Sequence, residues 1–83
     1  MGKGGDKMKN TKFKNISVEL LKANINVNTV AVEMGISTQA LYKKLNGETN
    51  INLKDMNAIR EILQKHTGKH STLEYLFGDS NDN

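Results

Sequence analysis

Short apolar stripes alternate with polar breaks along this chain of 83 residues, at a spacing near 3.6 residues that predicts amphipathic helices. The first stripe indicates a helix that Asn15 caps and that ends at Asn24, because asparagine tolerates the left-handed conformation. Its expected inward-facing residues are Ile16, Leu20 and Leu21. No segment alternates in polarity as strands do, and no internal repeat is present.

Two short helices follow, joined by Gly-Ile-Ser. Either Asn26 or Asn28 caps the first of them, which ends at Gly35. Its inward-facing residues are Val30, Ala31 and Met34. Ser37 is a natural N-cap for the second, which is predicted to span residues 38–46 and to end at the glycine that follows.

A polar loop then leads to a fourth helix, predicted over residues 53–65 and followed by Gly68. Its expected inward-facing residues are Leu53, Met56, Ile59, Ile62 and Leu63. Ser71 and Glu74 have the spacing of a capping box, and they predict a short fifth helix that ends at Phe77.

These elements divide the chain into a basic arm over residues 1–12, an all-α domain of five helices over 13–77, and an acidic polar tail over 78–83. The first 14 residues hold five lysines and one aspartate, a net charge of +4, whereas the rest of the chain carries −1. We expect the arm to be disordered, and either to wrap an anionic partner or to be a solubilising tail. Met8 resembles a natural start, so the residues before it are either native or a cloning remnant.

Composition excludes several classes of function. The chain has no cysteine, which removes disulfides, thiolate metal sites and cysteine nucleophiles. His66 and His70 have the spacing of a helical metal pair, but Gly68 lies between them and no third ligand is near in sequence, so we expect no metal and no cofactor. Scattered acidic residues argue against an enzyme. No apolar run is long enough for a membrane span, and we expect a cytoplasmic protein.

The Gly-Ile-Ser joint has the residues that a tight turn between two helices needs. Ala31 is small where the next helix crosses close above it, Gly35 supplies a positive φ, and Ile36 anchors the turn in the core. Leu41 and Leu45 hold the next helix down. At 100° per residue this leaves a polar arc of about 140° on that helix. Its members are Thr38, Gln39, Tyr42, Lys43 and Asn46.

This joint, with the YKKLNGE that follows it, resembles the helix-turn-helix repressors typified by Cro and lambda repressor (the XRE family), in particular their short single-domain phage versions. The resemblance covers about residues 15–77, and LKDMNAIREIL resembles the fourth helix of the family. Lys44 is a departure, since the family often has an apolar residue there; Leu45 takes over the anchoring and rotates the third helix slightly. The resemblance implies a lambda-repressor-like fold and a sequence-specific regulator of transcription that binds double-stranded DNA.

On this interpretation the third helix lies in the major groove. Gln39 is the first candidate for a base contact, because glutamine can pair with N6 and N7 of adenine. Thr38 meets either a thymine methyl group or a phosphate, and the rest of the arc contacts bases or backbone. The resemblance places Asn28, Thr29 and Lys54 against phosphates. The full set of candidate DNA-binding residues is Asn28, Thr29, Ser37, Thr38, Gln39, Tyr42, Lys43, Asn46 and Lys54.

One recognition helix contacts few base pairs, so we expect a weak homodimer that forms on a palindromic operator. The apolar residues of the fifth helix, Leu73, Leu76 and Phe77, either make that contact or cover their own core. Two alternatives to DNA binding remain open. One is an arbitrary helical bundle, and the other is a small interaction module that binds another regulator, which the domain charge of −1 allows.

Overall fold

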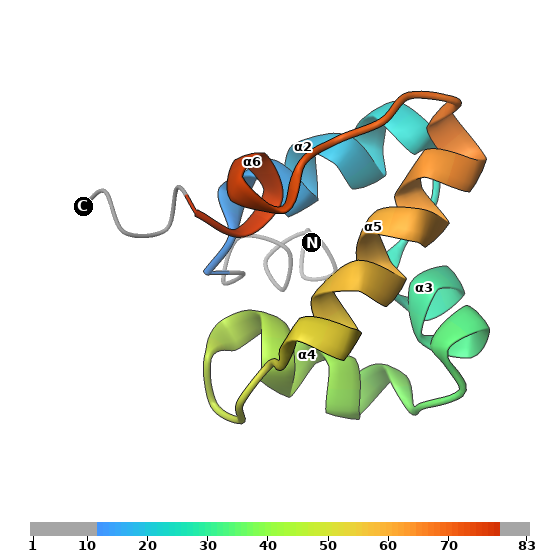
Figure 1. The fold of residues 1–83 in the computed structure, drawn as a ribbon. Coiled ribbons are helices and arrows are strands. Elements are labelled where there is room, and N and C mark those ends of the chain that lie inside the picture. Colours follow the sequence, from blue (N-terminus) through green and yellow to red (C-terminus); the bar gives the residue numbers. More distant parts are fainter. Residues whose placement is uncertain (1–11, 79–83) are drawn as a thin grey trace, which may run out of the picture.

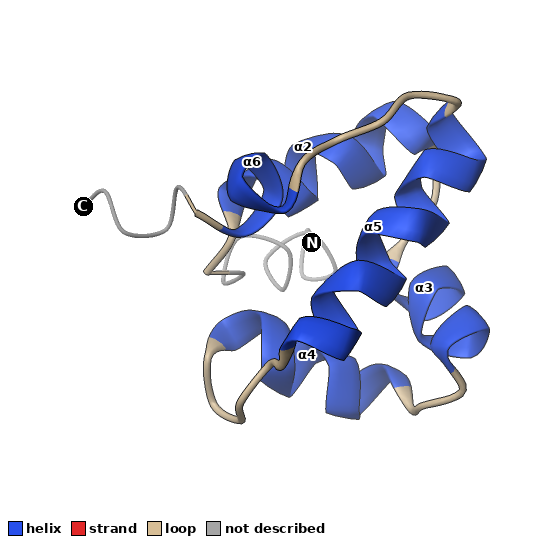
Figure 2. Ribbon diagram, in the orientation of Figure 1, coloured by secondary structure: helices blue, strands red, loops and turns tan. Residues whose placement is uncertain are grey.

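Five helices and no strand make up the part of the chain that the structure describes, residues 12–78 (Figure 1, Figure 2). This computed structural model contains α2 Lys14–Ala23, α3 Val27–Met34, α4 Thr38–Asn46, α5 Leu53–Thr67 and α6 Leu73–Phe77. The prediction of an all-α fold is therefore confirmed for these residues. The predicted basic arm, except Lys12, and the predicted acidic tail, except Gly78, lie outside the described residues.

Helix α5 crosses the middle of the molecule, and the other helices pack around it (Figure 1). It contacts α2, α3 and α6, while α2 also packs against α6. Helix α3 packs against α4, which lies at the end of the view opposite to α2 and α6 (Figure 1). This arrangement leaves α4 at the periphery, held mainly by the few side chains that it turns inward.

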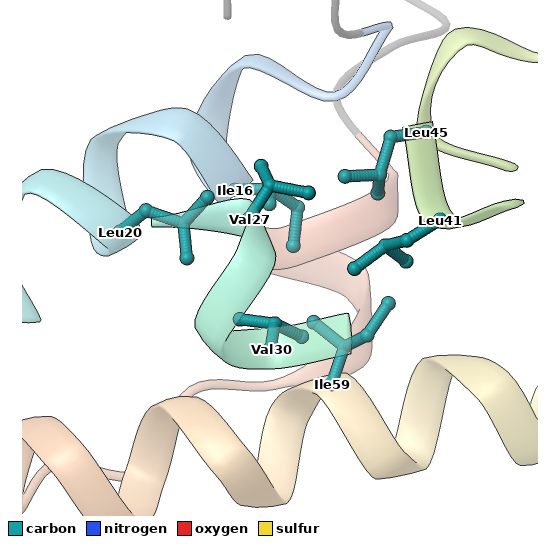
Figure 3. A pocket seen from close by; sticks show the side chains of 7 residues that line it. All are labelled: Ile16, Leu20, Val27, Val30, Leu41, Leu45 and Ile59. Atoms are coloured by element: carbon teal, nitrogen blue, oxygen red, sulfur yellow. The ribbon is translucent and has the colours of Figure 1, made fainter. Parts of the chain in front are cut away.

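The core contains thirteen buried apolar side chains: Phe13, Ile16, Leu20, Val27, Val30, Ala31, Leu41, Leu45, Ile59, Ile62, Leu63, Leu76 and Phe77. Seven of them, contributed by α2 to α5, meet around one central point (Figure 3): Ile16, Leu20, Val27, Val30, Leu41, Leu45 and Ile59. The void between these seven is only about 10 Å³. That is about the space of one water molecule, so the four helices pack to the density expected of a protein interior.

Local signals define the ends of α3 and α4 as predicted. Gly35 follows α3 with φ 79° and ψ 25°, in the left-handed region that glycine enters without strain. The Ser37 hydroxyl oxygen accepts a hydrogen bond from the Ala40 N–H at 3.0 Å and so caps α4. Helix α4 spans the predicted residues and ends before Gly47, which has φ 85°.

Two of the predicted N-caps, Asn15 and Ser71, are wrong because another residue takes the position. Helix α2 begins at Lys14 rather than after Asn15, and the Asn15 side-chain amide instead donates to the Tyr75 carbonyl at 2.7 Å, which ties α2 to α6. Of the two candidates for α3, Asn26 is the cap. Thr72, not Ser71, caps α6. Helix α5 continues two residues past its predicted end, to Thr67.

Two leucines that were expected to face inward are exposed. Leu21 in α2 is 80% exposed and Leu53, the first residue of α5, is 62% exposed. Periodicity predicts which side of a helix faces inward, but not how wide the buried part of that side is. Of the first stripe, only Ile16 and Leu20 reach the core. Met34 and Met56, which were also expected to face inward, are half-buried and pack against the core.

Helix α6 covers the core of its own chain. Leu76 is fully buried and Phe77 is 8% exposed. The Phe77 ring packs edge-to-face on Phe13, with 5.1 Å between the ring centroids and 76° between the planes. Of the two roles considered for these apolar side chains, the structure therefore supports the core role, and they are not free to form a contact between copies.

Phe77→Ala should therefore lower the free energy of unfolding by about 3–5 kcal/mol, because it removes a buried ring and leaves a cavity beside Phe13. Urea unfolding followed by circular dichroism measures the loss. Leu21→Ala is the matched control, and we expect a change within about 0.5 kcal/mol because this side chain is exposed. A folded Phe77→Ala variant of unchanged stability would contradict the core role.

Candidate nucleic-acid interface

The joint between α3 and α4 is a tight turn built from backbone hydrogen bonds. The Gly35 N–H donates to the Val32 carbonyl at 3.1 Å, and the Ile36 N–H donates to the Ala31 carbonyl at 3.0 Å. Ala31 is completely buried, in keeping with the predicted need for a small residue there. A Cβ on Gly35 would meet no atom within 4 Å, so the positive φ, not crowding, is what favours glycine at this position.

The predicted polar arc of α4 is uneven in exposure. Gln39 and Lys43 are exposed, whereas Thr38, Tyr42 and Asn46 are half-buried. Tyr42 packs against the core, so its ring is partly a structural group. Gln39 and Lys43 lie one helical turn apart, on the side of α4 opposite to Leu41 and Leu45. They are therefore the two arc residues most available to a ligand.

A hydrogen bond links two of the predicted contacts across the turn. The Thr38 hydroxyl donates to the Asn28 side-chain oxygen at 2.6 Å, which connects the first residue of α4 to the first turn of α3. Thr29 is engaged locally, because its hydroxyl donates to the side-chain oxygen of Asn26, the α3 cap. Both helix starts thus lie close together, with Asn28 exposed. Because the Asn28 side-chain oxygen accepts from Thr38, it is the side-chain NH₂ group of Asn28 that can donate to an outside ligand.

The side chain of Asn46, the last residue of α4, is half-buried. Its side-chain oxygen is buried and has no hydrogen-bond partner among the described residues. An adenine contact needs both the oxygen and the amide nitrogen of an asparagine, so this rotamer does not present the bidentate face. Asn46 contributes at most its amide nitrogen to an outside ligand.

Lys44 anchors α4 to α5 through an ion pair, a contact that the sequence analysis missed. Its ammonium lies 2.9 Å from Asp55 Oδ2 and 3.4 Å from the Asn50 carbonyl. Asp55 also accepts from the Asn52 N–H, and the Asn52 side chain accepts from the Asp55 N–H, which completes a capping box at the start of α5. The Asn-x-x-Asp spacing was the available signal. Lys44 thus replaces an apolar anchor, and the adjacent Lys54 stays exposed.

The backbone of Lys12 places the start of the described chain against α4. Its N–H donates to the Leu45 carbonyl at 2.8 Å, and its ammonium lies 5.8 Å from the centroid of the Phe13 ring. The described chain therefore begins beside the C-terminal end of α4, next to the proposed contact face. Sequence patterns carry no signal for this pairing, because it joins a residue before the first helix to the third.

Glu33 ties α3 to the far end of α5. Its Oε1 accepts from the Lys65 ammonium at 2.7 Å, and its Oε2 lies 2.8 Å from His66 Nε2. Hydrogen bonds from Lys65 and then His66 hold the pKa of the Glu33 carboxyl below its ordinary value. The negative charge of α3 is therefore compensated within the protein. None of the nine candidate DNA-binding residues is acidic, so these side chains themselves contribute only neutral and positive groups.

His66 and His70 have different hydrogen-bond partners. His66 contacts Glu33, whereas His70 Nδ1 lies 3.3 Å from the Gln64 side-chain oxygen. Across residues 12–78 no group of three or more histidine, cysteine, aspartate or glutamate side chains is arranged to hold a metal ion. The described polar chemistry consists of caps, cross-helix hydrogen bonds and ion pairs.

Comparisons of the chain with protein-family models, with curated proteins and with solved structures found no match. None of the helices from α2 to α6 has the length and apolar character that crossing a bilayer requires.

Replacing Glu33 with glutamine should change how stability depends on pH. A carboxylate whose pKa is lowered on folding stabilises the protein above its unfolded pKa, and that contribution disappears as the pH falls through the folded value. Glu33→Gln should therefore be less stable than the parent near pH 7, with the difference vanishing as the pH falls through the lowered pKa of the Glu33 carboxyl. Urea unfolding of the parent and of Glu33→Gln at several pH values measures the difference in stability.

Glu61→Gln is the control for this experiment, because Glu61 is an exposed glutamate of α5 for which the structure gives no ion pair. It should leave the pH dependence of stability close to that of the parent. A Glu33→Gln variant with the stability of the parent across the whole range would show that the contact between α3 and α5 contributes nothing.

Proposed function

We propose that this protein is a sequence-specific regulator of transcription that binds double-stranded DNA, a Cro-like repressor of phage or mobile-element origin. Helices α3 and α4 would form a helix-turn-helix unit, with α4 in the major groove. The observation that carries the proposal is the division of α4 into two sides. Leu41 and Leu45 are buried on one side, while the exposed Gln39 and Lys43 face outward from a peripheral helix.

The chemistry of this face supports duplex DNA as the ligand. Gln39 lies in the first turn of α4 and can pair with N6 and N7 of an adenine. Asn28 lies in the first turn of α3, where a side-chain amide and the helix N-terminus favour a phosphate. Lys43 and Lys54, which are both exposed and lie in α4 and in the first turn of α5, add positive charge. Base reading and backbone contact would thus come from adjacent elements.

One observation favours a second candidate, an interaction module that binds another regulator. Val18 and Leu21 lie three residues apart on α2 and are both exposed. A partner protein could cover them. Binding to duplex DNA separates the two candidates, because an interaction module should bind no duplex even at low salt.

The experiment that tests the proposal is duplex binding as a function of salt. A binder that neutralises phosphates with lysines loses affinity as salt rises, with a slope of about −0.9 in log K against log salt for each phosphate. Duplexes selected from a random pool and sequenced would supply the specific site. Absence of any selected sequence, together with no binding at low salt, would refute the proposal.

We expect Gln39→Ala and Lys43→Ala to weaken DNA binding in different ways. Loss of Gln39 should cost about 1–3 kcal/mol on the selected site and little on random DNA, because a base contact carries the specificity. Loss of Lys43 should weaken both DNAs and reduce the salt slope by about 0.9. Fluorescence anisotropy at several salt concentrations measures both effects. Equal losses for Gln39→Ala on the two DNAs would reassign Gln39 to backbone contact.

We further propose that two copies bind a palindromic operator. One α4 presents few side chains to bases, and a second copy across a twofold axis doubles the contact, with half-sites about one helical turn apart. Since Leu76 and Phe77 are in the core, the contact between copies would have to use other surface residues.

A palindromic duplex should therefore bind two copies cooperatively, and a single half-site should bind at least about tenfold more weakly. Sedimentation of the protein with each duplex gives the number of copies bound, and sedimentation of the free protein should give a monomer at low concentration. One copy bound to a single half-site at full affinity would contradict the dimer.

A further inference from the structure

Asn46 is unique among the asparagines of this chain in the residue that follows it. Of the eleven asparagines, only Asn46 precedes a glycine, and six others precede the β-branched residues isoleucine, valine or threonine. The backbone nitrogen of the following residue can attack an asparagine side chain, and a glycine leaves that nitrogen unhindered because it has no Cβ. The sequence thus concentrates this reactivity at the C-terminal end of α4.

We propose that Asn46 is a site of spontaneous deamidation, and that its deamidation switches off the proposed DNA binding. The Gly47 backbone nitrogen attacks the Asn46 side-chain carbonyl carbon and gives up its proton, and the side-chain carbon–nitrogen bond breaks to release ammonia. Water then opens the resulting five-membered succinimide at one of its two carbonyl groups. The product is an aspartate or an isoaspartate. The sum is amide plus water to carboxylate plus ammonium, with no oxidant or reductant.

The local geometry holds the attacking backbone amide but leaves the side-chain oxygen of Asn46 unbonded. The Gly47 N–H donates to the Lys43 and Lys44 carbonyls, the latter at 3.3 Å, within the last turn of α4. The Asn46 side-chain oxygen has no hydrogen-bond partner among the described residues, so no donor holds it in place. The Gly47 amide must therefore leave these two carbonyls before it can attack, whereas no bond to the oxygen of Asn46 has to break.

The folded helix still restrains the reaction, because attack requires Asn46 to leave its helical conformation. The Glu48 N–H donates to the Lys43 carbonyl at 2.9 Å, and the Lys12 N–H donates to the Leu45 carbonyl at 2.8 Å. These two bonds must open or bend before the last turn of α4 unwinds. Deamidation is thus governed by local opening of this turn, the kind of low-energy event expected at a helix end.

The product carboxylate is unfavourable for the fold and for DNA. At the end of α4 it meets the negative pole of the helix, and it replaces an amide whose oxygen is already buried without a donor. It also lies three residues after Lys43, within reach of an ion pair that would compete with a phosphate. One spontaneous step therefore adds a negative charge to the proposed interface and brings that charge within ion-pair distance of Lys43.

This consequence rests on the proposed function, whereas the chemical step does not. Bound DNA would hold α4 and reduce the opening of its last turn. Free protein should therefore lose activity with time while bound protein keeps it, so that Asn46 would limit the lifetime of unbound copies.

The chemical step is tested by ageing the full chain at mildly alkaline pH and mapping its peptides by mass spectrometry. We expect conversion to be concentrated at Asn46, and Asn46→Gln should remove it, since glutamine would have to close a larger ring and reacts far more slowly. Conversion at Asn52 or Asn57 as fast as at Asn46 would overturn the assignment, as would an intact Asn46 in the aged chain.

The functional step is tested by comparing Asn46→Asp with Asn46→Gln. Both replace the asparagine, so the difference between them isolates the charge. Asn46→Asp should bind the selected duplex about tenfold more weakly than Asn46→Gln, the size of one lost base contact. Equal affinities would refute the switch, while failure of the parent chain to bind any duplex would refute the proposed function and leave the peptide map to decide the chemistry.

Discussion

The burial of Leu41 and Leu45 is the constraint on which the rest of this structure depends. Both side chains are almost completely removed from solvent, and they meet residues of α2, α3 and α5 around a void of about 10 Å³ (Figure 3). Because these leucines are one turn apart, they fix the rotation of α4 about its axis. The opposite face is thereby directed outward, and Gln39 and Lys43 owe their exposure to that rotation.

Polar contacts then fix the position of α4 along the molecule. The pair between Lys44 and Asp55 joins it to the start of α5, and the hydrogen bond between Thr38 and Asn28 joins it to α3. The first contact is partly buried and the second is exposed, and together they link α4 to helices on two sides. A flexible surface loop could not present side chains to a duplex with the same definition, which is why binding residues on a packed helix are favourable.

The sequence predicted the α3–α4 unit well because its signals are local. Gly35 and Ser37 act on their immediate neighbours, so the bounds of α4 and the turn before it follow from a few residues. The starts of α2 and α6 were less predictable than their ends, and Asn15 is engaged by Tyr75, sixty residues away, instead of capping α2. The exposure of Leu21 likewise depends on how closely other helices approach, which periodicity does not contain.

The sequence indicated which residues could form the candidate site, but not which of them are exposed. The arc places five residues on one side of α4, yet it could not distinguish the exposed Gln39 from the half-buried Tyr42. Nor could it anticipate the buried oxygen of Asn46. These differences arise from side-chain packing and from partners on other helices, and they narrow the expected base contacts to the first two turns of α4.

The central claim, that the outward face of α4 binds duplex DNA, is tested most directly by mapping amide chemical shifts while a selected duplex is added at low salt. The account predicts that the largest perturbations lie in α4 and in the first turn of α3, with α2 and α6 nearly unchanged. Perturbations confined to the exposed Val18 and Leu21 region of α2, or none at any duplex concentration, would contradict it.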